Sequence, residues 1–141
     1  MDIAISINYW AVFVAALIPM ALGFGWYSAL FGKRWMALME MTEEEIREKS
    51  KGKEAVMYGG SFLASLVTAY VLAHIVEVFT AGEGGLMPGI EAGFWCWLGF
   101  VAAISLQSVT FEFRKIGLWG LNVGYNLLVL MVMGAVLGMW Q

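Results

Sequence analysis

Residues 116–141 of this chain read IGLWGLNVGYNLLVLMVMGAVLGMWQ, and none of them is charged. A helix needs about 20 apolar residues to cross the roughly 30 Å hydrocarbon core of a bilayer, so this stretch is long enough to span it. Three further uncharged runs precede it, at Ile3–Gly32, Ala55–Val76 and Ala92–Phe111. These runs lack the period-two alternation of membrane β-strands. The sequence therefore predicts an all-α polytopic membrane protein, a bundle of four transmembrane helices over about residues 7–31, 55–81, 87–112 and 117–139.

The composition agrees with lipid as the main solvent of the chain. Of the 141 residues, 61% belong to the AVILMFWYC set and 13% are charged, against roughly half and a quarter in soluble domains. A single cysteine excludes a disulfide framework and a multi-cysteine metal site. The net charge of −3 argues against a nucleic-acid partner. We interpret residues 1–141 as one transmembrane domain that contacts membrane lipid.

The basic residues all fall in two loops, which predicts the orientation. The loop at residues 32–54 holds Lys33, Arg34, Arg47, Lys49, Lys51 and Lys53, and the turn after the third helix holds Arg114 and Lys115. Four spans place these loops on one face, and the positive-inside rule makes that face cytoplasmic. We therefore expect a multi-pass protein of the inner (cytoplasmic) membrane with both termini outside the cytoplasm.

A capping box in the first loop predicts a short cytoplasmic helix. Thr42 precedes Glu45 by three residues, a spacing at which each side chain can bond the other's backbone amide. We expect a helix from Glu43 to Ser50. The loop is interpreted as a solvated connector, with a platform for lipid or a partner protein as the alternative.

Small residues mark one face of the fourth helix. Gly120 and Gly124, and likewise Gly134 and Gly138, are spaced to let two helices approach closely in lipid. This face predicts packing within the bundle, or a contact between copies of the chain. Asn122, on the opposite face, requires a protein partner or water and indicates either hydrogen bonding between helices or a polar pocket.

The second helix also divides into two faces. Ser61, Ser65 and Thr68 follow one face at helix-packing spacing. His74 and Glu77 lie on the other, and Glu91 starts the third helix at a similar depth, so these three side chains are candidates for an outer polar cluster. Ionisable groups in spans are often functional. The cluster suggests a divalent metal at His74 and Glu77 or a proton relay; the alternative is purely structural hydrogen bonding, with no cofactor.

A second polar cluster is predicted at the cytoplasmic side. Its candidate members are Tyr27, Gln107, Glu112, Arg114, Asn122 and Tyr125. Glu112 and Arg114 are expected to pair and fix the turn between the last two helices; a pocket for a polar solute or a lipid headgroup is the alternative. Pro19, in the middle of the first helix, removes one backbone hydrogen bond and predicts a bend.

Several motifs resemble those of one membrane-protein family. The stretch Leu22–Trp35 reads LGFGWYSALFGKRW, and Phe111-Glu112-Phe113-Arg114, Leu121-Asn122-Val123-Gly124-Tyr125 and the segment 134–140 follow in order. Together they resemble the bacterial family called domain of unknown function 1761 (DUF1761). The sequence departs from that pattern at Ala29, where proline is usual, and at Asn126, where histidine is frequent. The resemblance implies a four-helix bacterial membrane protein and brings no established activity.

These observations favour a small integral membrane protein that acts in transport or as a channel, or that binds a small solute or lipid, most simply as a parallel homo-oligomeric bundle. The alternative is a structural or partner-binding membrane subunit. A metal-dependent enzyme is the least favoured hypothesis, because no set of nucleophile, base and orienting residue is visible and no catalytic residue is assigned. The pattern does not identify the substrate.

Overall fold

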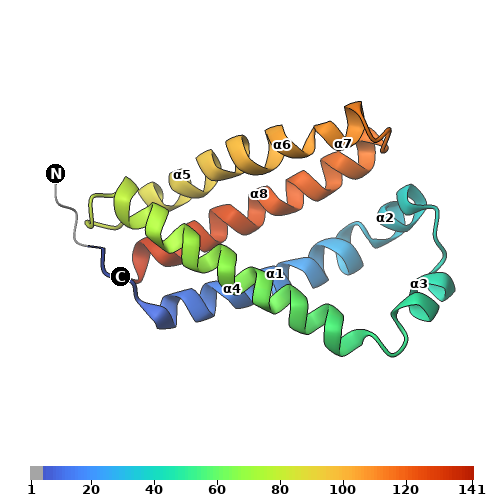
Figure 1. Ribbon diagram of the computed structural model, residues 1–141, viewed down its shortest axis with the longest axis horizontal. Coiled ribbons are helices and arrows are strands. Elements are labelled where there is room, and N and C mark those ends of the chain that lie inside the picture. Colours follow the sequence, from blue (N-terminus) through green and yellow to red (C-terminus); the bar gives the residue numbers. More distant parts are fainter. Residues whose placement is uncertain (1–4) are drawn as a thin grey trace.

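Four long apolar helices make up the protein, as Figure 1 shows for the computed structural model, which describes residues 5–141. Their bounds are Tyr9–Leu30, Glu54–Phe79, Leu86–Thr110 and Ile116–Met139, and each is long and apolar enough to cross a membrane. Each bound lies within two residues of its prediction. The predicted all-α fold class is thereby confirmed. The N-terminus and Ile3, which begins the first uncharged run, lie outside the described residues.

Two of the spans contain a π-helical turn. The first consists of α1 (Tyr9–Phe24) and the turn η1 (Gly25–Leu30). The third consists of α5 (Leu86–Trp97), the turn η2 (Leu98–Ala102), α6 (Ala103–Ser105) and α7 (Gln107–Thr110). The second and fourth are the continuous helices α4 (Glu54–Phe79) and α8 (Ile116–Met139). Local widening of this kind is frequent at functional sites.

The loop between the first two spans holds two short helices, α2 (Gly32–Met39) and α3 (Glu43–Ser50). At α3 the amide of Glu45 donates to the Thr42 hydroxyl at 3.1 Å, which is the N-terminal capping bond expected from the sequence. Helix α2 is followed by Glu40, whose left-handed backbone, with φ 57°, caps its C-terminus. The Lys115 ammonium donates to the Glu40 carboxylate at 2.9 Å, and this ion pair joins the loop to the start of α8.

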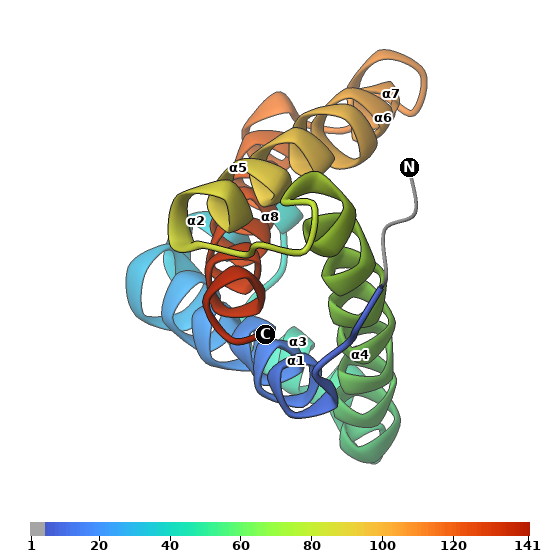
Figure 2. The same cartoon turned by 90° about the vertical axis from the view of Figure 1, so that its left-hand side faces the viewer.

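Helix α8 lies between the other spans, as the end-on view in Figure 2 shows. Its closest neighbour is α5, and the two cross at glycines. A Cβ atom on Gly89 or Gly93 of α5 would overlap backbone atoms of α8, and one on Gly134 or Gly138 would overlap backbone atoms at Gly89 and Gly85. Gly134 and Gly138 thus pack against α5 within the chain. A Cβ on Gly120 would meet nothing within 4 Å.

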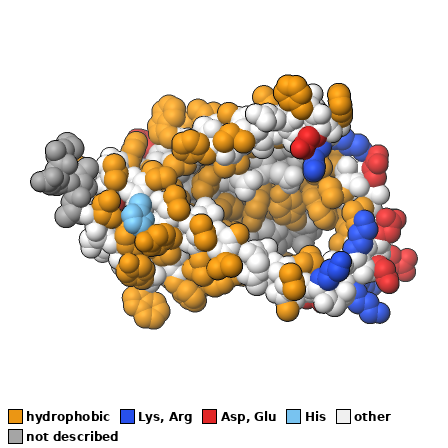
Figure 3. Space-filling model, in the orientation of Figure 1, with side chains coloured by type: hydrophobic (Ala, Val, Ile, Leu, Met, Phe, Trp, Pro, Cys, Tyr) orange, Lys and Arg blue, Asp and Glu red, His pale blue; other side chains and the backbone are white. Residues whose placement is uncertain are grey.

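The main hydrophobic core fills only one half of the bundle. Its buried residues are Ala11, Val12, Ala15 and Ala16 of α1, Ala69, Leu72, Ala73 and Val76 of α4, Ala92 of α5, and Val129, Leu130, Met133 and Leu137 of α8. All of them lie toward the turn at residues 80–85, which we call the opposite end. The basic end, defined by α2, α3 and the turn at 111–115, carries the Lys and Arg side chains, and there α4 diverges from α6 and α7 (Figures 1 and 3).

Candidate functional site

A cleft occupies the half of the bundle that the core leaves unfilled. Two adjoining cavities of about 490 and 370 Å³ share Pro19, Ser61, Ser65 and Tyr125 in their walls, and we call them together the central cleft. The first span, α4 and α8 supply most of its lining, and Val101 of η2 completes it. Figure 3 shows the molecule hollowed on this side, toward the basic end. The cleft therefore exists because the helices meet at one end and separate at the other.

The polar part of the wall carries hydroxyl and amide groups without charge. Ser61, Ser65 and Thr68 face the cleft from α4, and Tyr125 and Asn126 line it from α8. The Thr68 hydroxyl donates to a carbonyl of its own helix, Ala64, at 3.0 Å. The sequence placed the three α4 residues on one face at a spacing typical of helix packing. In the structure this face lines a cavity instead. The spacing of the residues alone does not distinguish a helix-packing face from a cavity-lining face.

Tyr125 connects α8 to the first span beside the cleft. Its hydroxyl donates to the carbonyl oxygen of Pro19 at 2.6 Å. The Tyr125 ring meets the Tyr27 ring edge-on, with 5.0 Å between centroids, and the Tyr27 hydroxyl donates to Asn122 Oδ1 at 2.6 Å. Gly23 leaves the space for the Tyr125 hydroxyl, which would lie 3.0 Å from a Cβ at that position. The structure thus brings together three members of the predicted inner cluster.

The remaining inner candidates lie nearer the basic end. A second cavity of about 150 Å³, which we call the hairpin pocket, is lined by Ser105, Ser108, Glu112, Arg114, Leu118, Trp119, Asn122, Val123 and Asn126. Glu112 and Arg114 form the expected ion pair at 3.1 Å, with both side chains mostly exposed. Gln107 is exposed and belongs to neither cavity's lining. Asn126 belongs to both the hairpin pocket and the central cleft, and so joins them.

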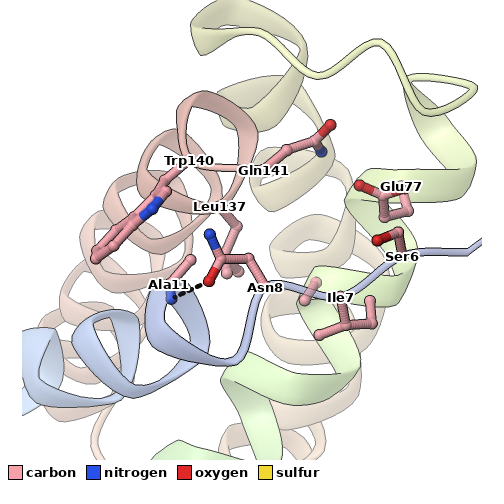
Figure 4. Close-up of a pocket in the computed structure, with 9 residues that line it drawn as sticks. Ser6, Ile7, Asn8, Ala11, Glu77, Leu137, Trp140 and Gln141 are labelled. Carbon is pink, nitrogen blue, oxygen red and sulfur yellow. Dashed lines mark hydrogen bonds between the residues drawn. The ribbon is translucent and has the colours of Figure 1, made fainter.

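The three outer candidates have different surroundings in the structure. His74 donates through Nδ1 to the carbonyl of Tyr70 in its own helix at 2.8 Å, and Glu91 is exposed. Glu77 is buried, with 6% of its surface exposed. It faces a small pocket shared with Ser6, Asn8 and Gln141 (Figure 4). Over residues 5–141, no three His, Cys, Asp or Glu side chains are grouped closely enough to hold a metal ion.

The rotation of α4 about its axis decides what each of these side chains meets. Glu77 is buried and lines the small pocket, whereas His74 is half-buried and bonds a carbonyl of its own helix. The pocket beside Glu77 has a volume of about 10 Å³, which is room for about one water molecule. The central cleft at the basic end is far larger than this pocket, and is therefore the stronger candidate for a ligand site.

Comparison with known proteins gives one match. Residues 10–138 match the family described as Protein of unknown function (DUF1761), which covers nearly the whole chain. No curated protein and no solved structure matches the chain.

Proposed function

This chain belongs to the family described as Protein of unknown function (DUF1761), and we propose that it takes a small uncharged solute into the central cleft, as a carrier or binding protein of the membrane. The observation that carries the proposal is the one-sidedness of the cleft. A polar cavity opens toward the basic end, while the glycine crossing and the alanine-rich core close the opposite end. A bundle open to one side is the arrangement expected of a carrier in one of its access states.

The chemistry of the wall supports a solute that forms hydrogen bonds without carrying a charge. Serine, threonine, tyrosine and asparagine side chains supply donors and acceptors, and apolar residues form the rest of the lining. Selective ion pathways instead use charged rings or converging backbone carbonyls. The cavity volumes, about 490 and 370 Å³, fall in the range of roughly 300–1,000 Å³ that is typical of small-molecule sites.

The orientation is part of the proposal. The four apolar helices are compatible with a multi-pass membrane protein. The positive-inside rule puts the basic end in the cytoplasm and both termini outside it, so that the cleft faces the cytoplasm and the inner leaflet. We further propose a bacterial inner membrane as the location, in line with the family pattern in the sequence.

A parallel homo-oligomer belongs to the proposal as well, although Gly134 and Gly138 do not support it because α5 already covers them. The uncovered part of the glycine face is at Gly120. A native mass measurement in mild detergent tests this element: a dimer or larger species supports it, and a monomer at all concentrations contradicts it.

Thiol accessibility tests the proposed cleft. In a Cys96→Ala background, Ser65→Cys places a thiol in the cleft, Ala73→Cys places one in the core, and Leu63→Cys places one on the exposed surface of α4. In vesicles of known orientation, a charged, membrane-impermeant thiol reagent should modify position 65 only when added on the side of the basic loops. Positions 63 and 73 should stay unmodified because lipid and packed side chains surround them. An unreactive position 65 would contradict the proposal.

A further inference from the structure

An apolar cavity continues the central cleft toward the opposite end. It is an open groove of about 290 Å³ between α4 and the third span, with Val67, Val71 and Phe100 exposed at its rim; we call it the apolar arm. Its lining residues are Val67, Thr68, Val71, Leu72, Ile75, Cys96, Phe100, Val101 and Leu130. The arm and the cleft share Thr68, Val101 and Leu130, so the two spaces adjoin.

The combined space is therefore polar at one end and apolar at the other. Ser28 and Tyr58 mark the polar end near the basic loops, and Ile75 and Cys96 mark the apolar end. Both π-helical turns contribute to the lining, η1 through Ser28 and η2 through Phe100 and Val101. An occupant of the whole space must have the same division, with hydrogen-bonding groups at one end and a hydrocarbon chain at the other.

The depth of the polar wall limits what this occupant can be. Thr68 and Asn126 lie well inside their helices, at a level where an ordinary lipid presents only hydrocarbon. Hydrocarbon offers no hydrogen-bond partner, so a polar side chain at this depth needs a bond within the protein, as the Thr68 hydroxyl has to Ala64, or else water or a polar ligand. Within the part of the chain that the structure describes, no side-chain hydrogen bond is formed by Asn126, and its amide borders two cavities.

The charge of the wall limits the head group. The central cleft and the apolar arm are lined by uncharged side chains. A phosphate or an ammonium group placed there would be desolvated without an ionic partner, which is strongly unfavourable. Glu112 and Arg114 line only the hairpin pocket, where they pair with each other.

We propose that the ligand is an amphiphile with an uncharged, hydroxyl-bearing head and at least one acyl chain, the chemical class of mono- and diacylglycerols. Its head bonds Ser61, Ser65 and Asn126 in the central cleft, and its chain lies in the apolar arm beside Cys96. This inference rests on the proposed function and names the class of solute for the same site. A phospholipid, whose head is charged, is excluded by the same wall.

Photo-crosslinking in nanodiscs of phosphatidylcholine tests this assignment. The probe is a diacylglycerol with a diazirine at the end of one acyl chain, and the comparison probe is a phosphatidylcholine with the same labelled chain. We expect the diacylglycerol probe to label Leu72, Ile75 and Cys96, which form the less exposed part of the arm, and unlabelled dioctanoylglycerol to reduce this labelling at least fivefold. The phosphatidylcholine probe should label the lipid-exposed surface instead.

Three variants make the test specific. Asn126→Leu and Ser65→Ala remove head-group contacts and should each lower labelling of the arm several-fold. Val71→Trp fills the arm from a half-exposed position and should abolish labelling there. Equal labelling of the arm by both probes, or no labelling by the diacylglycerol probe, would overturn the assignment. If position 65 still reacts with the thiol reagent in that case, the cleft stands and only the amphiphile is wrong.

Discussion

At the scale of single residues, Tyr125 shows how a polar group at membrane depth is satisfied. Its hydroxyl donates to Pro19 at 2.6 Å, on the helix where proline itself removes a backbone donor. Tyr27 and Asn122 form a second bond of the same length nearby. These two bonds hold the first span to α8 next to the cleft, and they stabilise its wall where few buried apolar contacts are available.

The replacement Tyr125→Phe should lower stability by about 1 kcal/mol, because it removes one hydrogen bond and keeps the ring. Denaturant or thermal unfolding in detergent micelles would measure the loss. Tyr9→Phe is the matched control, since Tyr9 is exposed at the start of α1. Equal stability of the two variants would mean that the bond to Pro19 does not hold the helices together.

The sequence predicted some contacts of the candidate site residues but not others. The Glu112–Arg114 pair follows from short spacing in a tight turn, so it could be predicted. The different surroundings of His74 and Glu77 depend on the rotation of α4 about its axis, and this is set by packing against α1, α5 and α8 rather than by α4's own sequence. The roles of Ser61 and Ser65 could not be predicted for the same reason.

At the scale of elements, the glycine crossing determines how α5 and α8 meet. Gly89 and Gly134 face each other so closely that neither position has room for a side chain. Close backbone contact of this kind replaces the hydrophobic driving force, which is absent between helices in lipid. The small-residue spacing in α8 predicted the approach. Which helix would approach was not predictable, because either a neighbour in the chain or a second copy satisfies the pattern.

Gly89→Ala should therefore destabilise the protein by roughly 1–3 kcal/mol, since the new methyl group overlaps the backbone of α8 and forces the helices apart. Gly120→Ala adds the same group where nothing lies within 4 Å, and should be neutral or slightly stabilising by the higher helix propensity of alanine. Thermal unfolding of both variants side by side would check the difference. A smaller effect at position 89 than at 120 would contradict the crossing.

At the scale of the whole molecule, the Lys115–Glu40 ion pair fastens the α2–α3 loop to the bundle at the basic end. The hydrogen bond and the positive charge of Lys115 hold the pKa of Glu40 below its ordinary range. A carboxyl group whose pKa is lowered by folding stabilises the folded arrangement above its unfolded pKa, and this contribution is lost as the pH falls through the folded value.

We therefore expect the loop to loosen when the pH falls from 7 to below about 4, the ordinary range of a glutamate. A spin label at position 44, which is exposed on α3, should become more mobile over that interval. Lys115→Met should show the mobile spectrum already at pH 7 and a smaller change with pH. An unchanged pH response in Lys115→Met would assign the loosening to other groups.

The sequence predicted the features of the architecture that the lipid environment requires, which are the four spans, but it did not predict the cleft. The length of an uncharged run predicts a transmembrane helix, because every backbone group must be hydrogen-bonded inside the hydrocarbon. Both bounds of each of the four helices lie within two residues of the prediction. The one-sided cleft depends instead on where large and small side chains are distributed between the two halves of all four helices. The effect of this distribution depends on which helices pack together, so it cannot be recognised in any single stretch of sequence.

The most direct test of this account is a pair of distances measured by double electron–electron resonance between spin labels in a membrane. One pair, at residues 58 and 110, spans the basic end between α4 and α7, and the other, at residues 79 and 87, spans the opposite end between α4 and α5. All four positions are exposed. The account predicts a clearly longer distance for the first pair, because the helices diverge toward the basic end. Equal distances at the two ends would contradict the open cleft on which the proposed function depends.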